Sequence, residues 1–314
     1  MTVKRSISFL LITVLFVLLA VGCSSDNAAE TKEETTKNSV TSEDKDNSET
    51  SKQDIPEVKE PTGTTDTTDT GISDNSGTET AVQPEITGEL SIKADSEGAV
   101  KEDGYKYIIS KGGDYRIRGN CGNRMIYIDA KGEELELHLE GVTMTSQIGA
   151  LIYVENAEEV TISASDGTTN ELSDLRPARA DKNEETEYGN AAIYSKDDLK
   201  FKGRGRLTVN GSYNNGIGCK NDIKIKNITL TVNAQNNGIK GNDSVTVESG
   251  NISITAKNGN GIKTENTHVS DKGNQKGYVT IKGGVVDINS ADDPIDAAYD
   301  LILDSKNAKV TTNK

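Results

Sequence analysis

The sequence predicts an all-β protein whose main domain is a single-stranded parallel β-helix, a solenoid of about eight coils of 22–24 residues. Two observations carry this prediction. Beyond residue 88, β-branched residues alternate with polar residues, and Gly and Asn interrupt the alternation at near-regular intervals. A short motif also recurs at a nearly constant period. The sequence lacks helical periodicity after its leader and lacks the Leu-rich consensus of a horseshoe repeat.

The first 22 residues have the plan of a bacterial export signal. Lys4 and Arg5 precede an apolar stretch over 9–21, and Gly22 stands directly before Cys23. This end resembles a lipoprotein signal, in which the Cys thiol accepts a diacylglyceryl group before cleavage. An ordinary signal peptide or an uncleaved anchor is the alternative, although the apolar stretch is shorter than the ~20 residues of a spanning helix. We expect residues 1–22 to be removed.

The mature chain is then expected to be exported and attached to the membrane only through lipid on Cys23, on the extracellular face of the cell. Residues 23–87 contain no Phe, Tyr or Trp, and Ser, Thr, Asp, Glu and Lys dominate them. Such a segment cannot bury enough apolar area to offset its ordering entropy. The sequence therefore predicts a disordered acidic stalk that holds a β-helix domain at 88–314 away from the membrane.

Composition restricts both the core and the partners. The 314 residues include no Trp and three Phe, so the core is expected to be aliphatic. Fifty acidic residues against 35 Lys and Arg give a net charge of −15, which repels nucleic-acid phosphates. We expect a monomer that binds no nucleic acid. Cys121 and Cys219 have no pairing spacing; they form one bridge or none, and we interpret them as small buried side chains.

The repeat is anchored on three Gly-Ile pairs, at 216, 238 and 261, which follow one another at steps of 22 and 23 residues. The upstream members are Ile126-Tyr127, Ile152-Tyr153 and Ala192-Ile193, and two apparent insertions, 177–188 and 267–277, lengthen individual steps. Equivalent residues should stack in columns at ~4.8 Å per coil. The columns expected to point inward are Leu199, Ile223, Val245 and Leu301; Phe201, Ile225, Val247 and Leu303; and Leu207/Val209, Leu230/Val232, Ile252/Ile254 and Val286/Ile288.

A corner column precedes the Gly-Ile pairs and consists of Asn215, Asn237, Asn260 and finally Asp293. One interpretation is an asparagine ladder, because Asn tolerates left-handed corners and its amide satisfies turn backbone groups. The other is that these oxygens coordinate Ca²⁺, which takes six to eight oxygen ligands. Asp292, Asp293 and Asp296 favour the metal, because three close carboxylates repel one another and no Lys or Arg lies within ten residues after Lys282.

A second polar column stands just before the inward residues and includes Asp198, Asp222 and Asp300. Turn carboxylates commonly accept backbone N–H bonds. The alternative is that these three residues also serve as metal or sugar ligands, and we keep them as candidate Ca²⁺ ligands.

Four segments, 166–174 (DGTTNELSD), 191–199 (AAIYSKDDL), 203–209 and 276–284, resemble a bacterial family of secreted carbohydrate-binding domain-containing proteins. The resemblance extends over roughly residues 90–310. It implies a right-handed parallel β-helix that binds plant-type polysaccharides, acidic sugars among them, with calcium along the coils and no established catalytic activity. The corner that commonly reads Asp-Gly-Ile in that family carries Asn here, except at the last coil, which implies fewer or weaker calcium sites.

Parallel β-helices also include polysaccharide lyases and hydrolases, so an enzyme is the main alternative. A lyase needs Ca²⁺-binding carboxylates and a basic residue near the abstracted proton, for which Arg204 and Arg206 are candidates. An inverting hydrolase needs two carboxyls ~6.5–9.5 Å apart, and only Asp292 and Asp293 suggest such a pair. His138 and His268 are interpreted as ordinary surface or turn residues. We expect no enzymatic activity.

The expected function is that of a non-catalytic surface lipoprotein that binds acidic or plant cell-wall polysaccharides with the help of Ca²⁺. A Ca²⁺-dependent pectate-type lyase and a structural adhesin are the alternatives. Outward basic residues either attract uronate polymers or simply keep a long sheet soluble, and Tyr213 lies where a ring can stack on sugar. The candidate ligand-binding residues are Lys200, Lys202, Arg204, Arg206, Lys224 and Tyr213.

Overall fold

The computed structural model describes residues 84–179 and 186–313. The chain divides into two units, Met1–Asn75 and Ser76–Lys314, and every described residue belongs to the second. The predicted export signal, Cys23 and the predicted stalk as far as residue 83 lie outside the described residues. Within the described ranges, no helix is long and apolar enough to cross a membrane.

All regular elements of the described residues are strands. The first twelve are β1 (Thr87–Ala94), β2 (Val100–Asp103), β3 (Lys106–Ile109), β4 (Gly113–Gly122), β5 (Met125–Asp129), β6 (Glu134–Ser146), β7 (Ile152–Asn156), β8 (Glu159–Ala164), β9 (Thr169–Asp174), β10 (Ala191–Ser195), β11 (Asp198–Gly203) and β12 (Arg206–Gly211). The others are β13 (Asn215–Cys219), β14 (Asp222–Ile225), β15 (Ile228–Ala234), β16 (Ile239–Gly241), β17 (Ser244–Val247), β18 (Gly250–Ala256), β19 (Ile262–Lys263), β20 (Tyr278–Ile281), β21 (Gly284–Ser290), β22 (Ile295–Asp296), β23 (Asp300–Leu303) and β24 (Ala308–Asn313).

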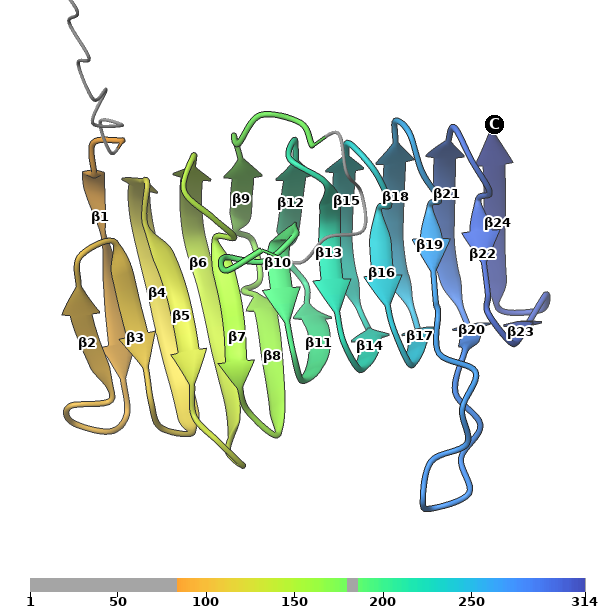
Figure 1. The fold of residues 1–314 in the computed structure, drawn as a ribbon, viewed down its shortest axis with the longest axis horizontal. Helices are drawn as coiled ribbons and strands as arrows, with labels where there is room; N and C mark the ends of the chain where they lie inside the picture. Colours follow the sequence, from red (N-terminus) through yellow and green to blue (C-terminus); the bar gives the residue numbers. More distant parts are fainter. Residues whose placement is uncertain (1–83, 180–185, 314) are drawn as a thin grey trace, which may run out of the picture. The chain divides into compact units, whose positions relative to one another are not determined.

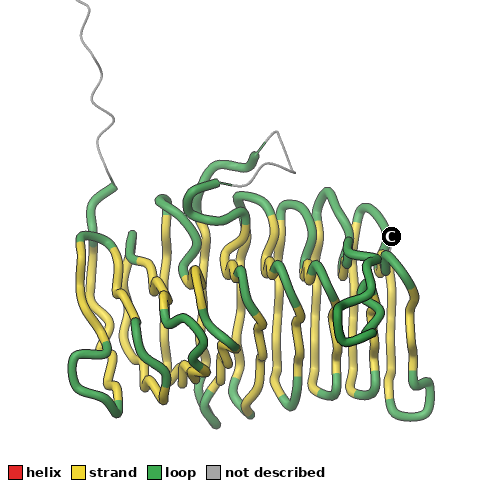
Figure 2. The backbone as a smooth tube through the Cα atoms, turned by 60° about the horizontal axis from the view of Figure 1, so that its bottom comes forward, coloured by secondary structure: helices red, strands yellow, loops and turns green. Residues whose placement is uncertain are grey.

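From β10 onward, three consecutive strands form one layer, and successive layers stack in sequence order (Figure 1). The first strand of each layer joins a nine-stranded sheet with the order β2-β3-β5-β7-β10-β13-β16-β19-β22. The other two join a fifteen-stranded sheet, one in the arm that ends at β23 and one in the arm that ends at β24. Figure 2 shows the loops that connect these strands at every corner.

The strand β6 joins the two arms. Its first part pairs with β8 from Glu134↔Glu159 onward, and its last part pairs with β9 through Ser146↔Asp174. The strand bends between these parts at Gly141, whose φ of 85° favours glycine. The fully buried Asn170 fixes the bend, because its Oδ1 accepts the N–H groups of Gly141 and Val142, each at 2.9 Å.

The strand order corrects the predicted fold. Thirteen strands follow one hydrogen-bonded path from β23 back to β6 and out again to β24. This path wraps around the core in a nearly closed, barrel-like wall, so the prediction of a right-handed single-stranded parallel β-helix is wrong. The pairs β1–β4 and β2–β3 are moreover antiparallel. The repeat in the sequence indicates which residues stack on one another. It does not indicate that one 13-residue strand, β6, pairs with two different strands of the same sheet.

Most of the predicted inward columns are confirmed in register and burial. Leu199 aligns with Ile223 and Val245 at no more than 1% exposure, and Val279 continues this column toward Leu301. Leu301 and Leu303 are in register but 42% and 46% exposed, so their assignment to the core is wrong. They lie on β23, the last strand of its arm, where no further described strand covers them. The two cysteines of this part of the chain, Cys121 and Cys219, are buried and unpaired.

The corner asparagines form a hydrogen-bonded ladder along the nine-stranded sheet. Asn215 Oδ1 accepts the backbone N–H of Asn237 at 3.2 Å, Asn237 Oδ1 accepts that of Asn260 at 3.0 Å, and Asn260 Oδ1 accepts that of Asp293 at 2.9 Å. The Asn237 amide also donates to Asn215 Oδ1 at 2.9 Å. All three asparagines are buried, so these bonds satisfy groups that water cannot reach.

Replacement of the central asparagine tests this ladder. Asn237→Ala leaves the Asn260 N–H without its acceptor and removes a donor from Asn215 in buried surroundings. We expect the free energy of unfolding, measured by urea titration, to fall by about 1–3 kcal/mol. Asn233→Ala is the control, because the exposed Asn233 amide makes the analogous bond to Asn210 Oδ1 at 2.9 Å. Equal losses in the two variants would contradict a structural role specific to the corner.

Candidate functional site

The six predicted metal ligands do not converge on one site. Asp292 and Asp293 are exposed at a corner, whereas Asp296 ends β22 in the nine-stranded sheet. Asp296 Oδ2 lies 2.7 Å from Lys263 Nζ, and it accepts the Asn260 amide at 3.2 Å. No Lys or Arg lies within ten residues after Lys282, but the stacking of layers brings Lys263, 33 residues earlier in the chain, against Asp296.

The other three predicted ligands belong to one column of the fifteen-stranded sheet. Asp198 aligns with Glu159 of β8, which in turn aligns with Glu134 of β6, and Asp222 follows Asp198 on β14. Asp300 lies further along the same register, beyond Ser244 and Tyr278. Asp198 Oδ1 accepts the Asp222 N–H at 3.2 Å, and Asp222 Oδ1 accepts the Ser244 hydroxyl at 2.6 Å. These bonds are those expected of turn carboxylates.

Stacked carboxylates raise the energy of the ionised form. Burial raises the pKa of the Asp198 carboxyl, its bond from the Asp222 N–H opposes this, and the negative charges of Asp222 and Glu159 raise it further. We call Glu134, Glu159, Asp198 and Asp222 the carboxylate column. These four acidic side chains lie in successive strands at ~4.8 Å.

The predicted basic residues are divided between the two arms of the sheet. Lys200 and Lys202 lie on β11 and Lys224 aligns with Lys200 on β14, whereas Arg206 begins β12 in the other arm. Lys200 Nζ lies 2.5 Å from Glu159 Oε1, and Lys202 Nζ lies 2.8 Å from Glu136 Oε2. These two lysines neutralise carboxylates. The exposed residues of the predicted set are Arg204, Arg206 and Lys224.

The ring of Tyr213 is already covered on one side. The Arg176 guanidinium lies 3.9 Å from its centroid, and the Arg179 guanidinium lies at 5.5 Å. Arg176 is held in place by the fully buried Asp174, at 2.7 Å. Tyr213 is therefore part of a packed cation–π cluster.

One group of side chains that the sequence interpretation overlooked surrounds His138. His138 Nε2 lies 3.6 Å from Asp114 Oδ1, and His138 Nδ1 lies 3.5 Å from Glu136 Oε1. The ligand atoms of all three lie within 4.8 Å of one another, a spacing that could hold a metal ion. Glu136 also pairs with Lys202, which competes for the same carboxylate.

The largest aromatic feature of the described residues is a column of tyrosines on the outer face of the nine-stranded sheet. Tyr127, Tyr153 and Tyr194 align on β5, β7 and β10. Adjacent ring centroids are 5.5 Å apart, with interplanar angles of 4° and 26°. Lys106 Nζ lies 4.6 Å from the Tyr127 centroid and covers that end of the stack. The rings support one another. Tyr153 and Tyr194 are 4% and 5% exposed, so the half-buried Tyr127 is the accessible ring of the column.

A groove of about 360 Å³ follows the tyrosine column, and we call it the tyrosine groove. Lys196 Nζ pairs with Glu155 Oε1 at 2.7 Å inside it. Tyr188, which precedes the left-handed Gly189 at a φ of 75°, packs edge-on against Tyr105 at 5.9 Å. The lining residues are Lys106, Tyr127, Tyr153, Glu155, Thr186, Glu187, Tyr188, Tyr194 and Lys196.

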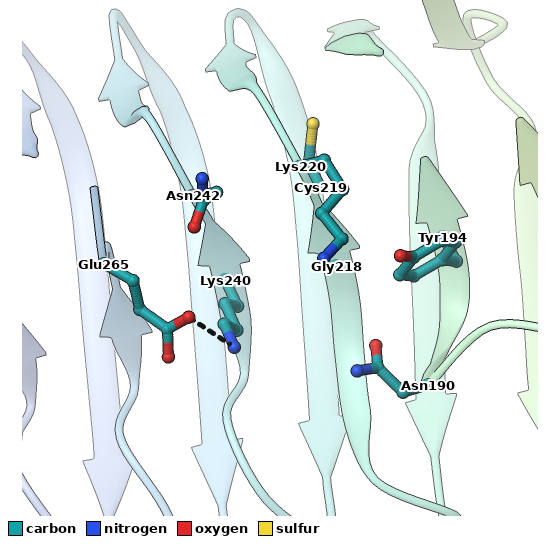
Figure 3. A pocket seen from close by; sticks show the side chains of 8 residues that line it. All are labelled: Asn190, Tyr194, Gly218, Cys219, Lys220, Lys240, Asn242 and Glu265. Carbon is teal, nitrogen blue, oxygen red and sulfur yellow. Dashed lines mark ion pairs between the residues drawn. The ribbon is translucent and has the colours of Figure 1, made fainter. Parts of the chain in front are cut away.

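A smaller pocket of about 120 Å³ adjoins the groove beyond Tyr194. Figure 3 shows Tyr194 on one side of it and the ion pair between Lys240 and Glu265 on the other. The pocket is lined by Asn190, Tyr194, Gly218, Cys219, Lys220, Lys240, Asn242 and Glu265.

Two side chains of the tyrosine groove, Tyr153 and Lys196, are held in their protonated forms. Burial raises the pKa of the Tyr153 phenol to about 12, and the nearby Glu155 raises it as well. The bond to Glu155 raises the pKa of the Lys196 ammonium. Both groups therefore keep their protons at neutral pH and act as donors.

Comparison with known proteins identifies related chains. Residues 103–314 match the family model described as carbohydrate-binding domain-containing protein. A protein of the same description from Acetivibrio thermocellus is 40% identical over 246 residues, which cover 74% of this chain and 83% of the relative. A solved structure of a polysaccharide lyase-like protein from C. thermocellum, a gadolinium derivative, is 40% identical with a TM-score of 0.63, and the match covers 70% of this chain and 86% of that one.

Removal of one charge tests the repulsion within the carboxylate column. The pKa of Asp198 is higher in the folded state than in the unfolded state, so its favourable contribution is present below the ordinary Asp value and is lost as pH rises through the raised pKa. Asp198→Asn keeps an oxygen for the Asp222 N–H and should raise the melting temperature at pH 7. The gain should shrink toward pH 3.5.

Asp304→Asn is the matched control for this substitution. Hydrogen bonds, first of all from the Asn307 amide, lower the pKa of the exposed Asp304 carboxyl, so its ionised form is the favoured one. This variant should gain no stability at pH 7. A melting temperature of Asp198→Asn at or below that of the unmodified protein at pH 7 would contradict the repulsion argument.

Proposed function

This chain belongs to the family of carbohydrate-binding domain-containing proteins, and on that premise we propose that residues 88–314 bind polysaccharide along the tyrosine groove without cleaving it. The observation that carries the proposal is the column of Tyr127, Tyr153 and Tyr194 beside an open groove of about 360 Å³. A volume in this range suits a small organic ligand. The groove crosses successive strands, so an extended chain can bind along it.

The proposed ligand is an acidic, uronate-containing polysaccharide, as in plant cell walls, and Ca²⁺ assists its binding. Four basic residues, Lys106, Lys196, Lys220 and Lys240, line the tyrosine groove and the adjoining pocket, and two of them pair with Glu155 and Glu265. The whole chain nevertheless carries a net charge of −15, which repels a polyanion. A hard cation that bridges protein and sugar carboxylates removes this repulsion. The carboxylate column and the exposed Asp292 and Asp293 are the proposed places for it.

A lyase is the second candidate, because the solved neighbour is described as polysaccharide lyase-like. Proton abstraction from a uronate needs a group that is unprotonated at the working pH. The raised pKa values of Tyr153 and Lys196 leave both groups protonated, so neither of these two side chains is the base of a lyase.

We further propose that the protein is exported and anchored to the outer face of the cell membrane by lipid on Cys23, with residues 24–87 as its tether. The basic pair, apolar stretch and Cys23 at the start of the chain support this. A single lipidated residue combined with a long acidic tether would leave the tyrosine groove available to polymers outside the cell.

Co-sedimentation tests the proposed function. The chain from Ser24 to Lys314 should be retained on polygalacturonate gel in Ca²⁺ and released by EDTA, with no absorbance from unsaturated uronate product. Tyr127→Ala should weaken retention about fivefold or more, equivalent to about 1 kcal/mol. Tyr278→Ala is the control, because Tyr278 is also half-buried but pairs with Tyr299 on the other sheet.

Each of the other outcomes supports a different function. Product formation would establish a lyase in place of a non-catalytic binding protein. Retention that EDTA does not change would contradict the role of Ca²⁺ while leaving carbohydrate binding intact. The absence of retention on polygalacturonate, cellulose and xylan would leave a structural adhesin.

Replacement of the predicted lipidated residue tests the anchor. Cys23→Ser removes the thiol that accepts the diacylglyceryl group, so the protein should move from the membrane fraction to the medium or remain as an unprocessed precursor. Cys121→Ser is the control, because this buried cysteine lies within β4. Fatty-acid labelling of Cys23→Ser equal to that of the unmodified protein would contradict lipid anchoring.

A further inference from the structure

The outer face of the fifteen-stranded sheet carries a histidine next to two carboxylates. Asp114 on β4 is the register partner of Glu136 on β6, and His138 follows Glu136 by two residues on the same strand. Leu137, which separates Glu136 from His138, is fully buried in the core. Because side chains alternate between the two faces of a strand, Glu136, His138 and the aligned Asp114 lie together on the outer face.

The spacing of these three side chains suits metal ligands better than hydrogen-bonded partners. His138 Nε2 lies 3.6 Å from Asp114 Oδ1, and His138 Nδ1 lies 3.5 Å from Glu136 Oε1, which is long for a hydrogen bond. A tetrahedral zinc ion with bonds of about 2.0–2.2 Å holds adjacent ligand atoms roughly 3.4 Å apart. Ligand atoms of all three residues lie within 4.8 Å of one another, so small rotations bring them to one ion.

A groove of about 190 Å³ beside these residues has an excess of negative charge. The carboxylates that line it are those of Asp114, Glu134, Glu136 and Glu159. Lys200 pairs with Glu159 and Lys202 with Glu136, so two of the four negative charges are neutralised. In the ranges that the structure describes, no Lys or Arg pairs with the other two carboxylates. The remaining charge of the groove is that which one divalent cation balances.

The neighbouring cations leave the ligand atoms accessible. Lys202 Nζ binds Oε2 of Glu136 at 2.8 Å, whereas Oε1 is the oxygen that faces His138. Arg116, the register partner of His138, directs its guanidinium to Glu140 at 2.8 Å. An ion that enters from the groove therefore displaces neither of these two ion pairs.

We propose that Asp114, Glu136 and His138 form a binding site for one Zn²⁺ ion. One ring nitrogen of His138 and one oxygen of each carboxylate bind the ion, and water occupies the fourth position. Ser163, the register partner of His138 on β8, is 7% exposed, and its hydroxyl has no hydrogen-bond partner among the described residues. This hydroxyl is available to the bound water. The ion links β4 to β6.

The nitrogen ligand distinguishes this site from the Ca²⁺ sites proposed for the carboxylate column. Imidazole suits Zn²⁺ and other transition metals, whereas Ca²⁺ takes six to eight oxygen ligands. The proposal goes beyond carbohydrate binding, because no sugar takes part in holding the ion. Zinc binding should therefore persist in an excess of Ca²⁺ and in the absence of polysaccharide.

Isothermal titration of the untagged chain from Ser24 to Lys314 with zinc chloride, in an excess of Ca²⁺, tests this site. One ion should bind per chain, and His138→Gln should weaken zinc binding about tenfold or more. His268→Gln is the matched control, because His268 is the other histidine of the chain and is exposed on the 267–277 insertion. Zn²⁺ should raise the melting temperature of the unmodified protein and of His268→Gln, but not that of His138→Gln.

Three results would overturn the site: no binding at micromolar Zn²⁺, unchanged zinc affinity of His138→Gln, or loss of zinc binding in excess Ca²⁺. If His138→Gln does not fold, Asp114→Asn decides, because the Asp114 side chain is exposed and can change without loss of packing. This variant should weaken zinc binding about fivefold or more, and full affinity would overturn the site. Retention on polygalacturonate is measured without Zn²⁺, so the zinc site and the proposed function fail or stand independently.

Discussion

Parallel hydrogen bonding between successive layers is the constraint on which this structure depends. It holds each side chain directly beside its equivalent one layer earlier, at ~4.8 Å. A residue type that recurs once per layer therefore forms a column. The interaction between neighbouring side chains of a column has to be favourable at that distance. Aliphatic residues meet the condition by close packing, the corner asparagines by amide hydrogen bonds, and the tyrosines by ring stacking.

The same constraint is unfavourable for carboxylates, which repel one another when stacked. The structure offsets this repulsion with cations from neighbouring columns or layers, as in the pairs Lys200–Glu159, Lys202–Glu136 and Lys263–Asp296. The basic residues of the central strands therefore serve first to neutralise the sheet. A count of charges along the chain does not show these pairs, because the two partners come from different layers.

The columns can be predicted from the sequence because alternation and period are local properties of the chain. The joining of two arms through β6 depends on the remote Asn170, whose amide bonds Gly141 from 29 residues away, and no periodicity signals it. The sequence contains a pattern that points to the tyrosine column, because Tyr127, Tyr153 and Tyr194 each follow an Ile. The insertion at 177–188 stretched the last step to 41 residues and concealed that the three tyrosines are neighbours.

A sheet surface made of regular columns has no deep pockets. Grooves and pockets form where the repeat is interrupted. The end of the 177–188 insertion brings Tyr188 over the sheet and forms one side of the tyrosine groove. Gly218 removes one member of the tyrosine column and opens the adjoining pocket. Both interruptions flank Tyr194, whose ring is held in place by the regular column on one side. The accessible rings beside the groove are those of the half-buried Tyr127 and Tyr188, and a ring that packing has ordered before a ligand arrives loses less conformational entropy on binding.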